Sequence, residues 1–180
     1  MKIIGLTAHA KTGKDTLAGA LTSRYSQMGF QRFAFADNLK KNLSTFIQRY
    51  FGYDVFNLTN EQKEIVRPLF IAFGCAKRKI DADYWVKQVD LQIEGAHLPI
   101  VITDFRFPSE AKYFAEKYGK DFHLFELKRD GVPTPPDEEL VNQPLMKPYV
   151  EMTITMEDSP SHYLQKHYTA AGVIFNRVFA

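Results

Sequence analysis

The chain has 180 residues, of which 45% are hydrophobic and 24% are charged, and its formal net charge is +2. This length and balance are typical of one soluble globular domain with a buried core. A charge this small does not by itself require nucleic acid or an acidic membrane as a partner. Cys75 is the single cysteine, so an internal disulfide is excluded, and no C-x-x-C or H-E-x-x-H spacing predicts a zinc site.

The N-terminal residues are expected to form a strand and not an export signal. The apolar run Lys2 to Leu6 is short and is followed by a glycine-containing loop, which predicts a buried strand and not a signal peptide. No apolar stretch approaches the length of a membrane span. We therefore expect a cytoplasmic protein with no membrane partner.

Apolar periodicity predicts alternating strands and helices along the chain. Thr59-Asn60-Glu61-Gln62 resembles a capping box, which predicts that a helix begins there. The predicted elements, in chain order, are a strand over 2–6, a helix over 16–28 closed by Gly29, a strand over 32–36, a helix over 38–50, a helix from Thr59 to near Gly74, a helix over 82–93, a strand over 98–103, a helix capped by Ser109 and ended by Gly119, strands over 122–127 and 150–156, and a helix from near Ser159.

This alternation predicts an α/β fold of three layers, a mostly parallel sheet with helices on both faces. The stretch 37–95 has no strong strand signal and is too long for an ordinary connection, so we expect a helical insertion that forms one wall of a cleft. The stretch 128–148 holds five of the nine prolines and no apolar periodicity, which predicts a mobile loop or lid. The whole chain is then a single domain.

Residues 8 to 16 read AHAKTGKDT, directly after the first predicted strand. Gly13 and Lys14 take the places of the Gly-Lys pair in the phosphate-loop pattern G-x-x-x-x-G-K-[ST], whose first glycine is replaced by Ala8. Such a loop must leave a buried strand and enter a helix, because backbone N–H groups and the positive helix end then surround the anion. Ala8 is acceptable if its position does not require a positive φ. The alternative is an ordinary strand-turn-helix in which Lys14 is a surface lysine and no phosphate binds.

Oxygen-bearing side chains near this loop predict a magnesium site. Asp15 stands where the pattern has a hydroxyl, and Thr16 supplies one a position later. Asp104 follows the buried LPIVIT run, the usual place of the magnesium-side acid beside a phosphate loop, and Arg106 would point from the same edge of the sheet. The alternative for Asp104 taken alone is a helix cap or a turn residue. We expect ATP and Mg²⁺ as cofactors, with Asp15, Thr16 and Asp104 as metal ligands.

The remaining cations predict an anionic acceptor. A phosphate monoester is already ionised near neutral pH, so phosphoryl transfer to it needs cations to hold two phosphates in line and no general base. Arg67 lies in an otherwise apolar run, where a buried guanidinium would need an anionic partner. Trp85 could stack on a base or pack in the core. The other candidate cations in predicted loops or cleft positions are Lys11, Lys40, Arg78, Arg106 and Arg129.

Several motifs together resemble the deoxynucleoside monophosphate kinases of bacteriophages, a phosphate-loop family. They are GKDT in the loop, FADNLK at 35–40, EIVRPLFIAFG at 64–74, Trp85 shortly after Arg78, and ITDFRFPSEA at 102–111. The resemblance implies that Ala10 to Thr16 (Ala10, Lys11, Thr12, Gly13, Lys14, Asp15 and Thr16) bind the donor nucleotide, with Lys14 and Lys11 on the transferred group. It implies that Asp37, Lys40 and Arg67 line the monophosphate site and that Arg129 belongs to a closing lid. A phage-encoded protein would act in the host cytoplasm.

The leading interpretation is an ATP-dependent kinase of a (deoxy)nucleoside monophosphate, whose partners are small nucleotides. A second interpretation keeps the loop and changes the acceptor to another phosphorylated metabolite, such as an isoprenoid or coenzyme precursor. A third is a non-catalytic nucleotide-binding module or a nucleic-acid-binding protein, which the scattered basic residues do not favour. The apolar tail at 172–175 could pack on the same chain or on a second copy in a homodimer.

Overall fold

The computed structural model describes residues 1–9, 11–131, 137–157 and 162–180. The chain forms two compact units, one made of Met1–Phe33 with Gly95–Ala180 and the other of Ala34–Glu94. Within the described ranges, no helix is both long and apolar enough to span a membrane.

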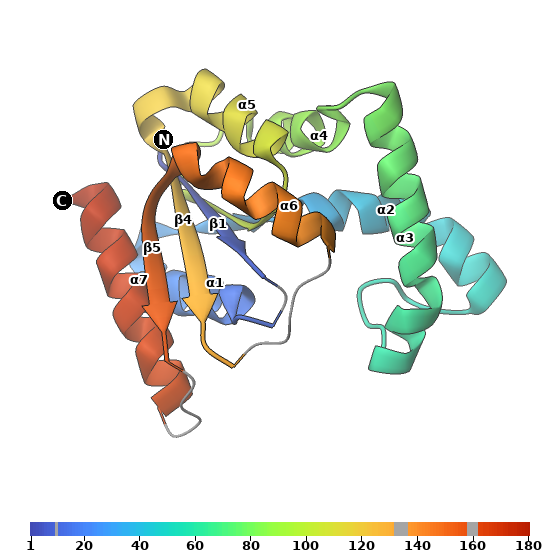
Figure 1. Ribbon diagram of the computed structural model, residues 1–180, viewed down its shortest axis with the longest axis horizontal. Coiled ribbons are helices and arrows are strands. Elements are labelled where there is room, and N and C mark those ends of the chain that lie inside the picture. The colour runs from blue at the N-terminus through green and yellow to red at the C-terminus, as the bar shows by residue number, and fades with distance from the viewer. Residues whose placement is uncertain (10, 132–136, 158–161) are drawn as a thin grey trace. The chain divides into compact units, whose positions relative to one another are not determined.

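The first unit is organised around a five-stranded sheet in the order β2-β3-β1-β4-β5, and every neighbouring pair is parallel (Figure 1). The strands are β1 (Ile3–Ala8), β2 (Gln31–Phe33), β3 (Ile100–Phe105), β4 (Phe122–Arg129) and β5 (Val150–Met156). The central strand β1 is buried along its whole length, as its apolar sequence predicts. Because all the strands are parallel, the residues that follow β1, β3 and β4 meet at one edge of the sheet.

Helices cover both faces of this sheet (Figure 1). Ile4 and Leu6 of β1 point to the face covered by α1 (Lys14–Arg24) and α7 (Tyr163–Phe179), where they pack in one apolar cluster with Leu17 and Ile174. The other face carries α5 (Pro108–Tyr118) and α6 (Asp137–Met146). Short 3₁₀ helices span Ser26–Met28, Gly119–Asp121 and Lys147–Tyr149. The predicted three-layer α/β fold is confirmed.

Gly5 leaves room for the Phe105 ring against the central strand. A Cβ at Gly5 would lie 2.7 Å from the ring of Phe105 on β3 and 2.9 Å from the side chain of Leu124 on β4. Phe105 in turn packs edge-on against Phe114 of α5, with ring centroids 5.5 Å apart. The missing side chain therefore makes room for the aromatic layer that attaches α5 to the sheet.

The second unit consists of α2 (Phe35–Phe51), α3 (Asn60–Ile80) and α4 (Tyr84–Ile93). Its apolar core includes Ile47, Val55 and Val66, all nearly inaccessible to solvent. The predicted capping box is confirmed, since Thr59 Oγ1 accepts the Gln62 N–H at 3.2 Å and Gln62 Oε1 accepts the Thr59 N–H at 2.9 Å. This reciprocal pair fixes where α3 begins.

Several predicted boundaries are wrong for identifiable reasons. The second strand ends at Phe33, because Phe35 already begins α2 and the alternating run 32–36 does not separate a strand from a buried helix start. The third strand spans Ile100–Phe105 and not 98–103, so Asp104 is a strand residue. The predicted helix start near Ser159 lies outside the described residues, and α7 is described from Tyr163.

Two predicted helix signals are also wrong. Helix α3 continues through Gly74 to Ile80, since the Gly74 backbone is helical and its carbonyl accepts the Trp85 Nε1–H at 3.2 Å. Helix α5 begins at Pro108, so Ser109 lies inside its first turn. Glu110 satisfies the helix start instead, because its Oε2 accepts the N–H groups of Arg106 and Phe107 at 2.8 and 3.0 Å.

The prediction of a loop over 128–148 is wrong for much of that stretch. Strand β4 extends to Arg129, α6 spans Asp137–Met146, and residues 132–136 lie outside the described residues. Of the described apolar side chains of α6, Met146 is buried, whereas Leu140, Val141 and Leu145 are exposed. A polar contact attaches it to the sheet, in which Gln143 Nε2 donates to Glu126 Oε1 at 2.9 Å. Periodicity cannot reveal a helix that is held in this way.

Glu151 ties three elements together at the start of β5. Its carboxylate contacts Nδ1 of His123 on β4 at 2.6 Å and accepts a hydrogen bond from Nε of Arg177 on α7. Burial acts to raise the pKa of Glu151, but these hydrogen bonds and the two neighbouring charges outweigh it and hold the pKa below its ordinary value of 4.5. The bonds therefore stabilise the folded chain fully above pH 4.5 and less as the pH falls through the lowered pKa.

We expect Glu151→Gln to lower the free energy of unfolding at pH 7 by about 1–3 kcal/mol, the range for hydrogen bonds to charged groups. Because the variant has no carboxylate to protonate, it should lose less stability than the wild type on acidification below pH 4.5. Urea unfolding at a series of pH values measures both effects. Glu116→Gln, an exposed carboxylate paired with Lys112 at 3.8 Å, is the control and should follow the wild type. Parallel pH curves for Glu151→Gln and wild type would contradict this assignment.

Candidate phosphate-binding site

The loop between β1 and α1 has the backbone shape of an anion-binding turn. Lys11 has φ 65° and Gly13 has φ 96°, both left-handed, and Ala8 has no positive φ and simply ends β1. Thr12 is buried between them, and its Oγ1 donates to the His9 carbonyl at 2.7 Å. Alternating backbone conformations of this kind turn successive N–H groups towards one point. Ala10, predicted to bind nucleotide, lies outside the described residues.

Helix α1 begins at Lys14 without a side-chain cap from Gly13. The N–H groups of its first turn have no carbonyl partner within the helix, so an anion at this end satisfies them and is also favoured by the helix dipole. The Lys14 side chain is only 14% exposed, and its ammonium lies 3.7 Å from the Asp15 carboxylate. The loop therefore offers a positive, pre-shaped seat for a phosphate group.

Asp15 and Thr16 differ in how free they are to bind a metal. The Asp15 carboxylate lies 3.4 Å from Arg32 as well as 3.7 Å from Lys14, so two cations share it. Thr16 Oγ1 lies 3.4 Å from the hydroxyl of Tyr163. Among the described residues no group of three or more His, Cys, Asp or Glu could hold a metal by itself. This is compatible with Mg²⁺, which takes one or two protein oxygens and keeps waters and phosphate oxygens.

Asp104 and Arg106 lie at the carboxyl end of β3, beside the strand that leads into the loop. Thr7 of β1 is in register with Phe105, and this pairing brings residue 104 to the same sheet edge as residues 8–16. Asp104 is half-buried and Arg106 is exposed.

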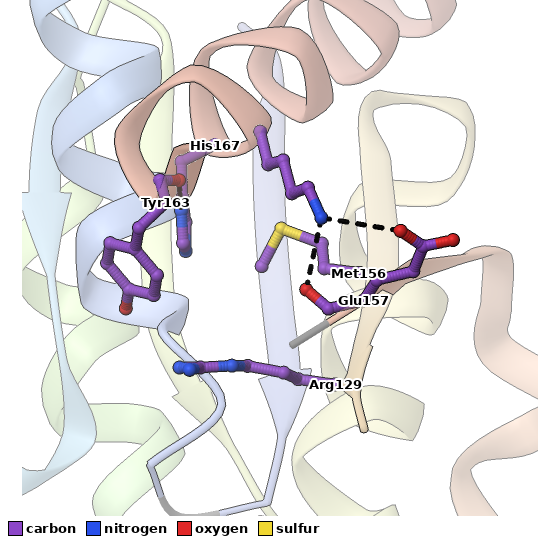
Figure 2. A pocket seen from close by; sticks show the side chains of 6 residues that line it. Arg129, Met156, Glu157, Tyr163 and His167 are labelled. Carbon is purple, nitrogen blue, oxygen red and sulfur yellow. Dashed lines mark hydrogen bonds and ion pairs between the residues drawn. The ribbon is translucent and has the colours of Figure 1, made fainter. Parts of the chain in front are cut away.

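Arg129 ends β4 and lines a pocket with residues of β5 and α7 (Figure 2). Its guanidinium lies over the ring of Tyr163, 5.0 Å from the centroid. Lys166 closes another side, and its ammonium lies 3.5 Å from the carboxylate of Glu157. The pocket is lined by Arg129, Met156, Glu157, Tyr163, Lys166 and His167. The rings of Tyr163 and His167 adjoin the phosphate loop at Gly13, and Arg129 lies beside the Tyr163 ring.

The predicted acceptor-site residues belong to the second unit. Asp37 and Lys40 form an ion pair of 3.8 Å in the first turns of α2. Arg67 is 54% exposed and pairs with Glu64 at 3.6 Å, so the expectation of a buried guanidinium in an apolar run is wrong. The run is apolar because α3 packs through Val66 and Phe70, while position 67 turns to solvent.

Arg78 and Trp85 have different surroundings in this unit. Arg78 is half-buried on α3. Trp85 is 3% exposed, its indole N–H is used by the Gly74 carbonyl, and its ring packs edge-on against Tyr84 with centroids 4.8 Å apart. The prediction that Trp85 binds substrate by stacking is therefore not supported, because both the ring and its donor are occupied in the core.

Comparison with known families matches residues 6–120 to the sequence model of phosphomevalonate kinase. The chain belongs to that family. The matched segment contains the phosphate loop, the whole second unit and Asp104. The family assignment and the loop together make the chain a kinase of the phosphate-loop class, a phosphotransferase.

Two further proteins show the range of kinases that resemble this member of the phosphomevalonate kinase family. A predicted deoxynucleotide monophosphate kinase of Acanthamoeba polyphaga mimivirus is 29% identical over 163 residues, which cover 73% of this chain and 76% of the relative. The dephospho-CoA kinase of Campylobacter jejuni superposes with a TM-score of 0.50 at 13% identity, over 98% of this chain and 99% of that one. The latter shows a shared fold alone.

Sequence reasoning missed three residues of this kinase site. Arg32 on β2 donates to Thr103 Oγ1 at 3.2 Å and faces Asp15, and a charged residue inside a predicted strand was the available signal. Tyr163 and His167 reach the loop from α7, about 150 residues further along the chain. Their spacing of four residues places them on one helix face, but no local pattern connects that face with Gly13.

We expect Gly13→Ala to destabilise the protein and Gly19→Ala, in the same helix, to leave it as stable or more stable. A methyl group at Gly13 would lie 2.5 Å from His167 Nε2, and the residue has φ 96°. The backbone conformation alone should cost about 1–3 kcal/mol. A methyl group at Gly19 meets nothing within 4 Å and should stabilise α1 by about 0.5–1 kcal/mol. Urea unfolding measures both, and equal stability of the two variants would contradict the expectation.

Proposed function

We propose that this kinase transfers the γ-phosphoryl group of ATP, in the presence of Mg²⁺, to the phosphate of a (deoxy)nucleoside monophosphate. The observation that carries phosphoryl transfer is the loop, with left-handed Lys11 and Gly13 before the uncapped start of α1. The nucleotide acceptor is supported by the name of the mimivirus relative and by the motifs at 35–40 and 64–74.

The chemistry asks little of the protein beyond positioning and charge. A monophosphate has its second pKa near 6, so an acceptor oxygen is already anionic at neutral pH and no general base is needed. The first-turn N–H groups of α1 and Lys14 would bind the outer phosphates of the donor, and Lys11 would act on the transferred group. Thr16 and Asp104 would hold magnesium, which supplies charge neutralisation when bound. Arg129 would neutralise the donor from the end of β4.

The second unit would bind the acceptor. Among the described residues, Arg67 has only the exposed Glu64 as an ion-pair partner, and an exposed pair of this kind is weak, so an anionic ligand could replace Glu64. Lys40 and Asp37 offer a cation and an acceptor within one turn of α2. Arginine suits a phosphate because its planar fork binds two oxygens at once. Arg78 would add positive charge for the acceptor phosphate within the second unit, and Arg106 would do so for the donor phosphates at the sheet edge of the first unit.

We expect Lys14→Ala to reduce kcat by about 100-fold or more, as loss of one transition-state donor does, while the protein still folds. Lys112→Ala is the matched control, since Lys112 is an exposed lysine of the same unit whose ion-pair partner among the described residues is the exposed Glu116. ADP release from Mg·ATP with a saturating acceptor measures turnover, and circular dichroism checks the fold. A fully active, folded Lys14→Ala enzyme would refute the assigned mechanism.

Arg67→Ala should raise the KM of the acceptor by at least about 10-fold and leave the KM of ATP near the wild-type value. Thermal stability should not change, because a surface ion pair contributes about 0–1 kcal/mol. Arg49→Ala, at the last turn of α2, is the control for losing a positive charge from the same unit. Steady-state kinetics with each substrate varied in turn separate the two KM values. An unchanged acceptor KM would remove Arg67 from the acceptor site.

A second candidate acceptor is favoured by the family itself, a phosphorylated non-nucleotide metabolite of the phosphomevalonate type. The same cations would serve it, because both acceptors present a dianionic phosphate. A panel of ribo- and deoxynucleoside monophosphates, phosphomevalonate and dephospho-CoA, assayed for ADP release, distinguishes them. Turnover restricted to phosphomevalonate would replace the nucleotide proposal, and turnover with particular nucleotides would establish it.

A further inference from the structure

We propose that Tyr163 and His167 of α7 are positioning residues for the phosphate loop, which they hold from behind without contacting the phosphates. The inference rests on the proposed role of this loop in binding the phosphate donor. Both residues lie near the C-terminal end of the sequence and belong to none of the motifs at 8–16, 35–40, 64–74 or 102–111. The inference therefore adds residues to the site that those motifs do not contain.

The contact with Gly13 is close and comes from two side chains. A Cβ added at Gly13 would lie 2.5 Å from His167 Nε2 and 2.7 Å from the Tyr163 hydroxyl. The two rings also contact each other, with centroids 4.3 Å apart. Together they pack against the Cα of Gly13, the residue directly before α1, so the loop backbone at position 13 has no room to move towards α7.

The hydrogen bonding of His167 leaves one nitrogen directed at the loop. Nδ1 lies 2.7 Å from the Tyr163 carbonyl, which can only accept, so Nδ1 carries the proton. His167 is 1% exposed, and its Nε2 is buried with no hydrogen-bond partner among the described residues. An apolar ring would fill the same space without an unsatisfied acceptor. We infer that Nε2 accepts a backbone N–H of the turn 11–13 when that turn closes round a phosphate chain.

Tyr163 also contacts the metal side of the loop. Its hydroxyl lies 3.4 Å from Thr16 Oγ1, in the first turn of α1. The guanidinium of Arg129 lies over the Tyr163 ring, 5.0 Å from its centroid. Figure 2 shows Tyr163 and His167 side by side on α7, with Arg129 below them. The phenol thus orients the Thr16 hydroxyl, which the proposed function places beside magnesium.

Three variants separate this role from ordinary packing. His167→Asn keeps a donor for the Tyr163 carbonyl and deletes Nε2, whereas His167→Gln returns a polar group to the place of Nε2. Tyr163→Phe removes only the hydroxyl. The control is Tyr168→Phe, which removes a hydroxyl that joins α7 to α1 at Ser23 Oγ, 3.1 Å away and remote from the loop.

The measurement is the equilibrium Kd of Mg·ATP and of Mg·tripolyphosphate, a phosphate chain without a nucleoside, by calorimetry and without any acceptor. We expect His167→Asn to raise both Kd values by about 10-fold, which corresponds to ~1.4 kcal/mol. Tyr163→Phe should also weaken both ligands, His167→Gln should recover part of the loss, and Tyr168→Phe should bind like the wild type. Thermal melts confirm that each variant is folded at the assay temperature.

The outcomes are distinguishable. If the wild type binds neither ligand, the proposed function of the loop fails. If the wild type binds and folded His167→Asn binds both ligands equally well, the positioning role is overturned. It is also overturned if only ATP binding weakens, because His167 would then contact the nucleoside and not act through the loop. An equal loss for both ligands, with recovery in His167→Gln, supports it.

Discussion

The backbone of Gly13 is the constraint on which the rest of the site depends. This residue has φ 96°, directly precedes α1 without a side chain that could cap it, and lies against two rings of α7. The left-handed turn sends the chain from β1 into the helix, and the uncapped first turn leaves N–H groups for a phosphate. A side chain at this position would disturb the helix start and the contact with α7 at once. The loop therefore connects β1 to α1 and is contacted by α7 at Gly13.

The sheet makes that connection rigid. β1 is buried on both faces, by α1 and α7 on one side and by the Phe105 and Phe114 layer on the other. Its neighbours β3 and β4 run parallel to it, so Asp104 and Arg129 lie at the same edge as the loop. Phosphoryl transfer depends on holding charged groups in place more than on covalent chemistry. A parallel sheet with a closed apolar core supplies such a base.

The ion pairs of the proposed acceptor site are exposed, which suits the binding and release of a substrate phosphate better than a permanent structural role. Arg67 has an exposed carboxylate partner, and Lys40 and Asp37 are paired on the surface of α2. Pairs of this kind contribute little to stability, so replacing one partner by a phosphate would cost the fold little. The ionic network that does stabilise the fold, Glu151 with His123 and Arg177, lies at the start of β5, whereas Arg129 and the loop lie at the carboxyl ends of the strands.

The sequence by itself determined the local features: a buried first strand, a phosphate loop entering a helix, the capping box at Thr59 and the α/β alternation. Each of these follows from residues within a few positions of one another. It predicted a loop where α6 lies and a buried guanidinium at Arg67, and it left base stacking and core packing open for Trp85. A helix attached by polar contacts, the exposed side of an apolar run and a buried ring all depend on neighbours distant in the chain. Only the tertiary structure placed Tyr163 and His167 behind Gly13 and Arg32 beside Asp15. These contacts join separate elements, whose pairing is fixed by sheet order and packing and leaves no periodicity in the sequence.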